Sequence, residues 1–82
     1  MHQEYTIKLI YGFNKFNKGD ALEIICYLAS MQVGFEPCPD LDSETRLIIG
    51  DKTFSYEDFR REKSEIEKLV LRERELQKGR ID

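Results

Sequence analysis

The 82-residue chain is poor in the residues that build disulfide frameworks and zinc sites. It has two cysteines, Cys26 and Cys38, and one histidine, His2. Two cysteines do not make a disulfide framework, and in a reducing compartment we expect both to be free thiols. No combination of Cys and His has the spacing of a zinc site. We therefore expect no metal and no cofactor, and we interpret both thiols as unreactive.

Long apolar runs and a strong charge of one sign are also lacking. No stretch approaches the ~18 apolar residues that cross a bilayer, and residues 1–13 lack the features of a secretory signal. We therefore expect a cytoplasmic protein without a membrane partner. The 13 basic and 16 acidic residues give a net charge of −3. This mild acidic excess argues against nucleic-acid binding through bulk charge.

The residues that are present predict one small α+β domain spanning residues 1–82. Residues 4–13, EYTIKLIYGF, alternate in polarity, which is typical of a strand covered on one face. The inward set is Tyr5, Ile7, Leu9, Tyr11 and Phe13. On the other face Ile10 is also apolar, which indicates a central strand.

Residues 20–32 predict a helix that lies across the sheet. Ala21, Ile24, Ile25 and Leu28 follow the spacing of one helical face. Three further apolar residues widen this stripe to roughly half of the circumference: Leu22, Ala29 and Met31. The helix begins either at an Asp20–Glu23 capping box or one turn earlier at Asn17, and we expect Gly34 to be its C-terminal cap.

The remainder predicts a short strand, a hairpin and a long helix. Val33 and Phe35 fit a strand parallel to the first, because the helix serves as a crossover, and Pro37 and Pro39 stop it. Residues 46–56 predict a hairpin with a type II′ turn at residues 50–51. A capping box at residues 55–58 opens a helix over about 56–78, which partly projects beyond the sheet.

The resulting order, β-α-β-β-β-α in a mixed sheet, is loosely similar to the thioredoxin and glutaredoxin group. The run TRLIIGDKTFSYEDFRR resembles the segment in which a glutaredoxin closes its sheet and enters its last helix. The chain departs from the group in three respects. No CxxC follows the first strand, no proline immediately precedes the hairpin, and the helix before the hairpin is missing. The resemblance therefore implies a topology without the redox chemistry.

The last helix carries the clearest indication of a partner. Leu69, Val70 and Leu71 are consecutive, so a single packed face cannot bury all three. We predict a partner-binding surface on this helix, formed by Ile66, Leu69, Val70, Glu73 and Leu76. Small acidic domains of bacteria and phages often act by binding a larger host protein. The sequence thus predicts a non-enzymatic protein–protein interaction module, either a homodimer or a binder of another protein.

Two alternatives belong to other functional classes. Lys15, Phe16 and Lys18 precede or open the first helix, where they could stack a base and hold a phosphate of a nucleotide or nucleic acid. A degenerate thioredoxin-like enzyme would instead use Cys38 as its thiol. The first alternative requires salt-dependent binding, and the second requires a thiol of lowered pKa.

Overall fold

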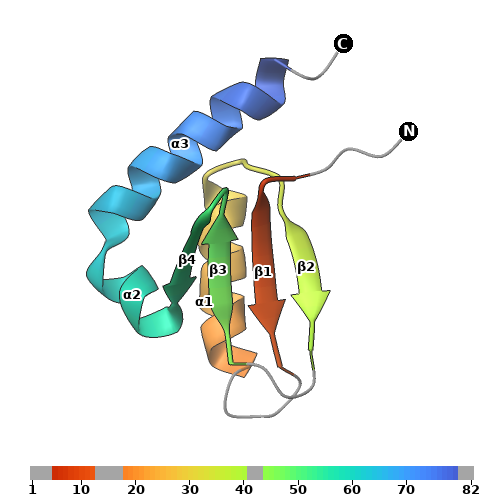
Figure 1. Cartoon of the computed structure of the whole chain (residues 1–82), viewed down its shortest axis with the longest axis vertical. Helices are drawn as coiled ribbons and strands as arrows, with labels where there is room; N and C mark the ends of the chain where they lie inside the picture. The colour runs from red at the N-terminus through yellow and green to blue at the C-terminus, as the bar shows by residue number, and fades with distance from the viewer. Residues whose placement is uncertain (1–4, 13–17, 41–43, 80–82) are drawn as a thin grey trace.

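The computed structural model describes residues 5–12, 18–40 and 44–79 and confirms a small α+β domain with a mixed four-stranded sheet (Figure 1). Its elements follow the order expected from the sequence, except that the last helix is divided in two. They are β1 (Ile7–Tyr11), α1 (Lys18–Ser30), β2 (Glu36–Pro39), β3 (Arg46–Ile49), β4 (Lys52–Ser55), α2 (Tyr56–Arg61) and α3 (Lys63–Gly79).

The strands lie in the order β2-β1-β3-β4, so β1 is central, as Ile10 indicated. β1 pairs in parallel with β2 across the α1 crossover and antiparallel with β3, and β3 pairs antiparallel with β4. Nothing in this order conflicts with the thioredoxin-like arrangement, which stays a prediction at the level of detailed topology.

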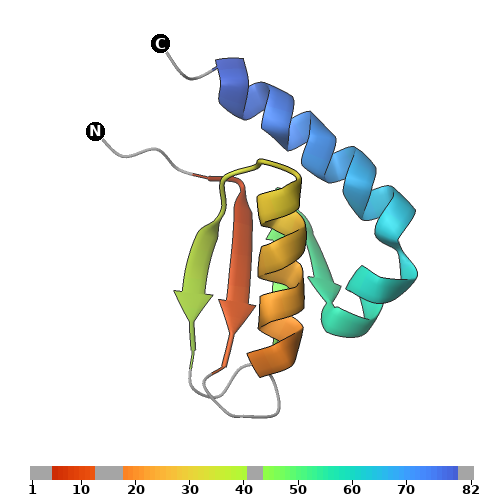
Figure 2. The ribbon, with the colours of Figure 1, turned by 180° about the vertical axis from the view of Figure 1, so that it is seen from behind.

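One face of the sheet carries the core, and α1 and α3 pack against it (Figure 2). Ile7 and Leu9 of β1 are fully buried, as the alternation predicted. Strands β1, β3 and β4 and all three helices contribute to one cluster: Ile7, Leu9, Ile24, Leu28, Val33, Leu47, Ile49, Phe54, Phe59, Ile66 and Val70. A shared core of this kind makes α3 part of the domain and not an appendage.

Strand β2 corrects the expected position of the second strand, because it contains both prolines. The parallel pairing is as predicted, but the strand starts at Glu36 and not at Val33. The backbone N–H of Asp40 donates to the carbonyl of Tyr11 at 2.9 Å. Since alternate residues of a strand point to opposite edges, the nitrogens of Pro37 and Pro39 face the free edge. Prolines are tolerated there, and they block the addition of another strand.

Helix α1 ends differently from the prediction. Gln32, not Gly34, has the left-handed conformation, with φ of 56°. The N–H of Gln32 donates to the carbonyl of Ala29, and the N–H of Val33 to that of Leu28, which is a Schellman motif. Gly34 instead lies close to Tyr5: a Cβ atom there would overlap the tyrosine ring, which would have to shift. Helix α1 begins at Lys18, one turn earlier than a cap at Asp20 requires.

The hairpin and the capping box are as predicted, but the last helix is interrupted. Gly50 has φ of 63° and Asp51 does not have a positive φ, so the turn is type II′. The helix that starts after Ser55 breaks at Glu62, whose φ and ψ are −111° and 41°. Neither proline nor glycine lies at this break. Phe59 of α2 and Ile66 of α3, on either side of the break, are both fully buried.

The C-terminal half of α3, which was predicted to project beyond the sheet, is held to the rest of the domain by polar contacts. Apolar burial ends at Val70, but polar contacts continue beyond it. The side-chain amide of Gln77 accepts from the N–H of Gly34 at 2.7 Å and donates to its carbonyl at 2.8 Å. The hydroxyl of Thr6 donates to the carboxylate of Glu73. Side-chain hydrogen bonds therefore hold this half of α3 against the α1–β2 turn.

Candidate functional site

The partner surface predicted on α3 is largely taken up by the domain itself. Ile66 and Val70 are fully buried, so they are not accessible to a second chain. Leu69 packs partly against the core, and Glu73 accepts the hydrogen bond described above. Of the five residues predicted, only Leu76 is widely exposed, at 47 %.

The inference that residues 69–71 cannot all be buried is confirmed. Leu71 is 40 % exposed, whereas Leu69 is half-buried and Val70 is buried. Leu71 and Leu76 are five residues apart, hence roughly 140° apart around the helix. They do not form one continuous face, and the charged side chains Glu67, Lys68 and Glu75 neighbour Leu71 along the helix.

A larger apolar surface lies on α1, on the flank away from α2. The ring of Tyr27 packs edge-on against Phe59 of α2, with 5.4 Å between the ring centroids. Ile25 and Ala29 are each two residues from Tyr27, so they lie roughly 200° around the helix from it. Leu22 belongs to the same flank and is 51 % exposed, more than any other large apolar residue described. The broad stripe in the sequence thus extends beyond what the sheet covers.

This flank of α1 faces the β1–β2 side of the sheet (Figure 2). Pro37 is paired with Leu9, whose buried side chain points towards α1, so Pro37 lies on the same face. Phe35 and Tyr11 pack partly against the core here. We call the combined set the α1–β2 surface: Tyr11, Leu22, Ile25, Ala29, Phe35 and Pro37. None of these six side chains is charged.

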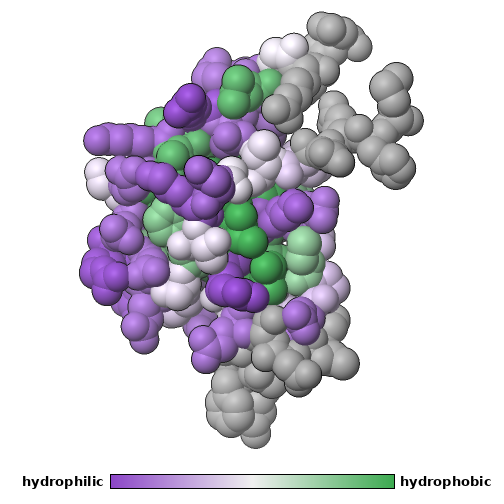
Figure 3. Space-filling model, viewed as in Figure 1, coloured by the Kyte–Doolittle hydropathy of each residue, from purple (hydrophilic) through white to green (hydrophobic). Residues whose placement is uncertain are grey.

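The opposite face of the sheet is open and chemically mixed. The strand registers give two rows across it, which are Glu36–Lys8–Ile48–Thr53 and Cys38–Ile10–Arg46–Ser55. In Figure 3 a green apolar area lies over the middle of the sheet, with purple hydrophilic surface around it. The long stems of Lys and Arg cover apolar neighbours while their charges reach water. This face therefore has the character of a solvated surface.

The thiols lie apart from each other. Cys26 is exposed on α1, beside the α1–β2 surface, and Cys38 is partly exposed on the open face. Partial burial, and then the hydrogen bond that the thiol donates to Glu36, raise the pKa of Cys38. A raised pKa keeps the thiol protonated at neutral pH, whereas nucleophilic cysteines have a lowered pKa.

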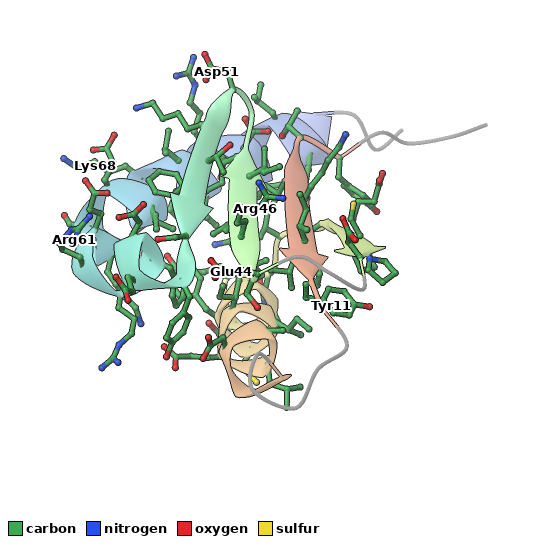
Figure 4. All side chains as sticks on the ribbon, turned by 60° about the horizontal axis from the view of Figure 1, so that its bottom comes forward. Tyr11, Glu44, Arg46, Asp51, Arg61 and Lys68 are labelled. Carbon is green, nitrogen blue, oxygen red and sulfur yellow. The ribbon has the colours of Figure 1, made fainter. Side chains whose placement is uncertain are left out.

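An acidic pocket of about 320 Å³ lies where α1 and α2 begin. Asp20 and Glu57 stand in the first turns of these helices, where a negative charge stabilises the helix dipole. Glu44, also in the pocket, lies just before β3 (Figure 4). Within the described residues no three His, Cys, Asp or Glu side chains are placed to hold a metal ion. Interaction with the helix dipoles accounts for two of the three carboxylates.

The predicted nucleotide contact falls mainly outside the described residues. Lys15 and Phe16 lie there, and Lys18 is the first residue of α1. Nucleotide binding by this loop stays a prediction. Comparison with known proteins found no matching family model, no matching curated protein and no matching solved structure. Of the helices described, none combines the length and the apolarity of a membrane span.

Proposed function

We propose that this chain is a non-enzymatic protein–protein interaction module that binds through the α1–β2 surface. The observation that carries the proposal is the exposure of Leu22, at 51 %, within a group of six uncharged side chains. Contiguous exposed apolar patches mark interaction sites in soluble proteins. Burial of one leucine side chain contributes about 1.5–3 kcal/mol, so a partner that covered this surface would gain appreciable affinity.

The proposal moves the contact from α3, where the sequence placed it, to α1. Ile66 and Val70 are buried in the core of the domain. Leu76 and Leu71, the exposed leucines of α3, lie on different sides of that helix. On α1 the exposed and half-buried apolar residues are continuous along one flank. The protonated state of Cys38 favours a binding role over thiol catalysis.

The test compares three immobilised baits: the native chain, Leu22→Lys and Leu71→Lys. Both leucines are exposed on helices, at 51 % and 40 %, but only Leu22 belongs to the α1–β2 surface. Each bait is incubated with extract of the cells that produce the protein, and retained proteins are quantified by mass spectrometry. We expect Leu22→Lys alone to lose specifically retained proteins. Equal retention by all three baits would contradict the proposal.

A further inference from the structure

We infer that the end of α3 is a conformational latch, which opens from the turn between α1 and β2 while the core of the domain stays folded. We call residues 71–79 the α3 latch. In Figure 2 the end of α3 lies beyond the sheet, next to that turn. The inference concerns a contact within the chain, so it is independent of the function proposed above.

The α3 latch lacks the apolar burial that holds the rest of the helix. Ile66 and Val70 are fully buried, whereas each of residues 71–79 is exposed or half-buried. The two leucines of the latch, Leu71 and Leu76, are 40 % and 47 % exposed. Burial of apolar surface is the main favourable term in folding, and segments with little of it open locally. The change in burial after Val70 therefore predicts a change in local stability at the same place.

Side-chain hydrogen bonds hold the latch closed. The carboxylate of Glu73 accepts from the hydroxyl of Thr6. The carboxamide of Gln77 accepts from the N–H of Gly34 and donates to its carbonyl. Each of these bonds contributes modestly, because bonds to water replace it when the latch opens.

Closure of the latch also buries a polar atom that has no partner. Arg74 donates from Nη2 to the side-chain oxygen of Gln32 at 3.2 Å. Its Nε atom is buried and makes no hydrogen bond within the described part of the chain. A buried donor without an acceptor costs free energy in the closed state, and opening returns it to water. This cost offsets part of what the other contacts contribute, so the closed state is favoured by a small margin.

The contacts of the latch belong to one rigid element. Glu73, Arg74 and Gln77 lie within about one turn of α3, and a helix moves as a unit. Their partners lie on two segments, one just before β1 and one between α1 and β2. We therefore expect the contacts to break together. Opening then frees the N–H and carbonyl of Gly34 and the hydroxyl of Thr6 at this end of the sheet.

The experiment measures amide hydrogen exchange of the native chain by NMR, under conditions in which the exchange rate reports the opening equilibrium. The N–H of Gly34 is the reporter, because its acceptor is the side chain of Gln77. Each rate is divided by the rate of the same amide in an unfolded chain. We expect Gly34 to exchange about a hundredfold faster than the slowest amides of β1, since local opening costs less free energy than global unfolding.

A substitution in the core separates opening of the latch from unfolding of the domain. Ile66 is fully buried, and Ile66→Val weakens the core equally in the closed and the open state. It should therefore raise the exchange rates of the β1 amides about fivefold, because they need global unfolding. The rate of Gly34 should stay unchanged.

Two substitutions at the latch test whether its contacts open together. Thr6→Val and Glu73→Ala each remove the bond between these two side chains and leave the contact of Gln77 with Gly34 in place. We expect either change to raise the exchange rate of Gly34 about tenfold, because the closed state loses a hydrogen bond to a charged group. Arg72→Ala is the matched control, since Arg72 is exposed and adjacent to Glu73, and it should leave the rate unchanged.

Three results would overturn the inference. If Gly34 exchanged as slowly as the β1 amides and responded equally to Ile66→Val, the latch would open only when the whole domain unfolds. If Gly34 exchanged at the rate of an unfolded chain, the latch would not be closed in solution. If neither Thr6→Val nor Glu73→Ala changed the rate of Gly34, each contact would open by itself.

Discussion

The side-chain hydroxyl of Tyr27 is buried and makes no hydrogen bond within the described residues. The ring of Tyr27 packs against Phe59 and lies under the ammonium of Lys63. Removal of a buried, unpaired hydroxyl relieves a desolvation cost. We therefore expect Tyr27→Phe to raise the free energy of unfolding by about 1 kcal/mol at pH 7, as measured by urea denaturation.

The stability gained by Tyr27→Phe should depend on pH. Burial, and then the negative charge of Glu67, raise the pKa of Tyr27 in the folded chain. Above pH ~10 the unfolded tyrosine therefore loses its proton more readily than the folded one, so the native chain loses stability as pH rises. The advantage of Tyr27→Phe should grow between pH 7 and pH 10.5. Tyr56→Phe is the control, because it removes a hydroxyl that donates to Glu23 at 2.7 Å and should bring no gain at pH 7.

At the scale of elements, the end of α1 is a site of stored backbone strain. Gln32 holds the left-handed position that glycine usually occupies in a Schellman motif. Its side chain also accepts a hydrogen bond from Arg74 at 3.2 Å. Gln32→Ala removes this bond but keeps the Cβ atom, so we expect Gln32→Gly to be more stable than Gln32→Ala by about 1 kcal/mol in thermal unfolding. Equal stabilities would mean that φ at this residue carries no strain.

Local patterns in the sequence were sufficient to predict the position of some strands and helices but not of others. Period-two alternation located β1, and glycine in a two-residue turn located the β3–β4 hairpin, because both signals come from the segment itself. Strand β2 was misplaced, because a proline stops a strand only where its nitrogen must donate, and here it faces a free edge. The break at Glu62 has no local signal, since neither proline nor glycine lies there and Phe59 and Ile66, seven residues apart, would share one face of an unbroken helix.

At the scale of the whole molecule, the candidate site depends on how much of each apolar stripe the fold covers. The sequence identified the stripes of α1 and α3, but a stripe does not say which of its residues will meet the rest of the chain. From the sequence we expected the sheet to cover the broad apolar stripe of α1 and a partner to bind the apolar residues of α3. The small sheet leaves Leu22 uncovered, whereas Ile66 and Val70 of α3 are fully buried in the core. Helix α3 is thus a core helix, and the exposed part of the α1 stripe is the surface that we propose for a partner.

The burial of Ile66 and Val70 determines where the chain can be shortened. Truncation after Ser64 removes Ile66 and Val70, each of which contributes about 1.5–3 kcal/mol by burial, from a domain whose total stability is on the order of 5–15 kcal/mol. We expect this truncation to abolish cooperative thermal unfolding.

Truncation after Arg72 keeps both core residues and removes the contacts of Glu73 and Gln77 with Thr6 and Gly34. These are partly buried, polar contacts, so the shorter chain should retain a cooperative transition with a lower midpoint. A cooperative transition after truncation at Ser64 would show that α3 is dispensable to the core. Only in that case would the apolar face of α3 be available to a partner, as the sequence first suggested.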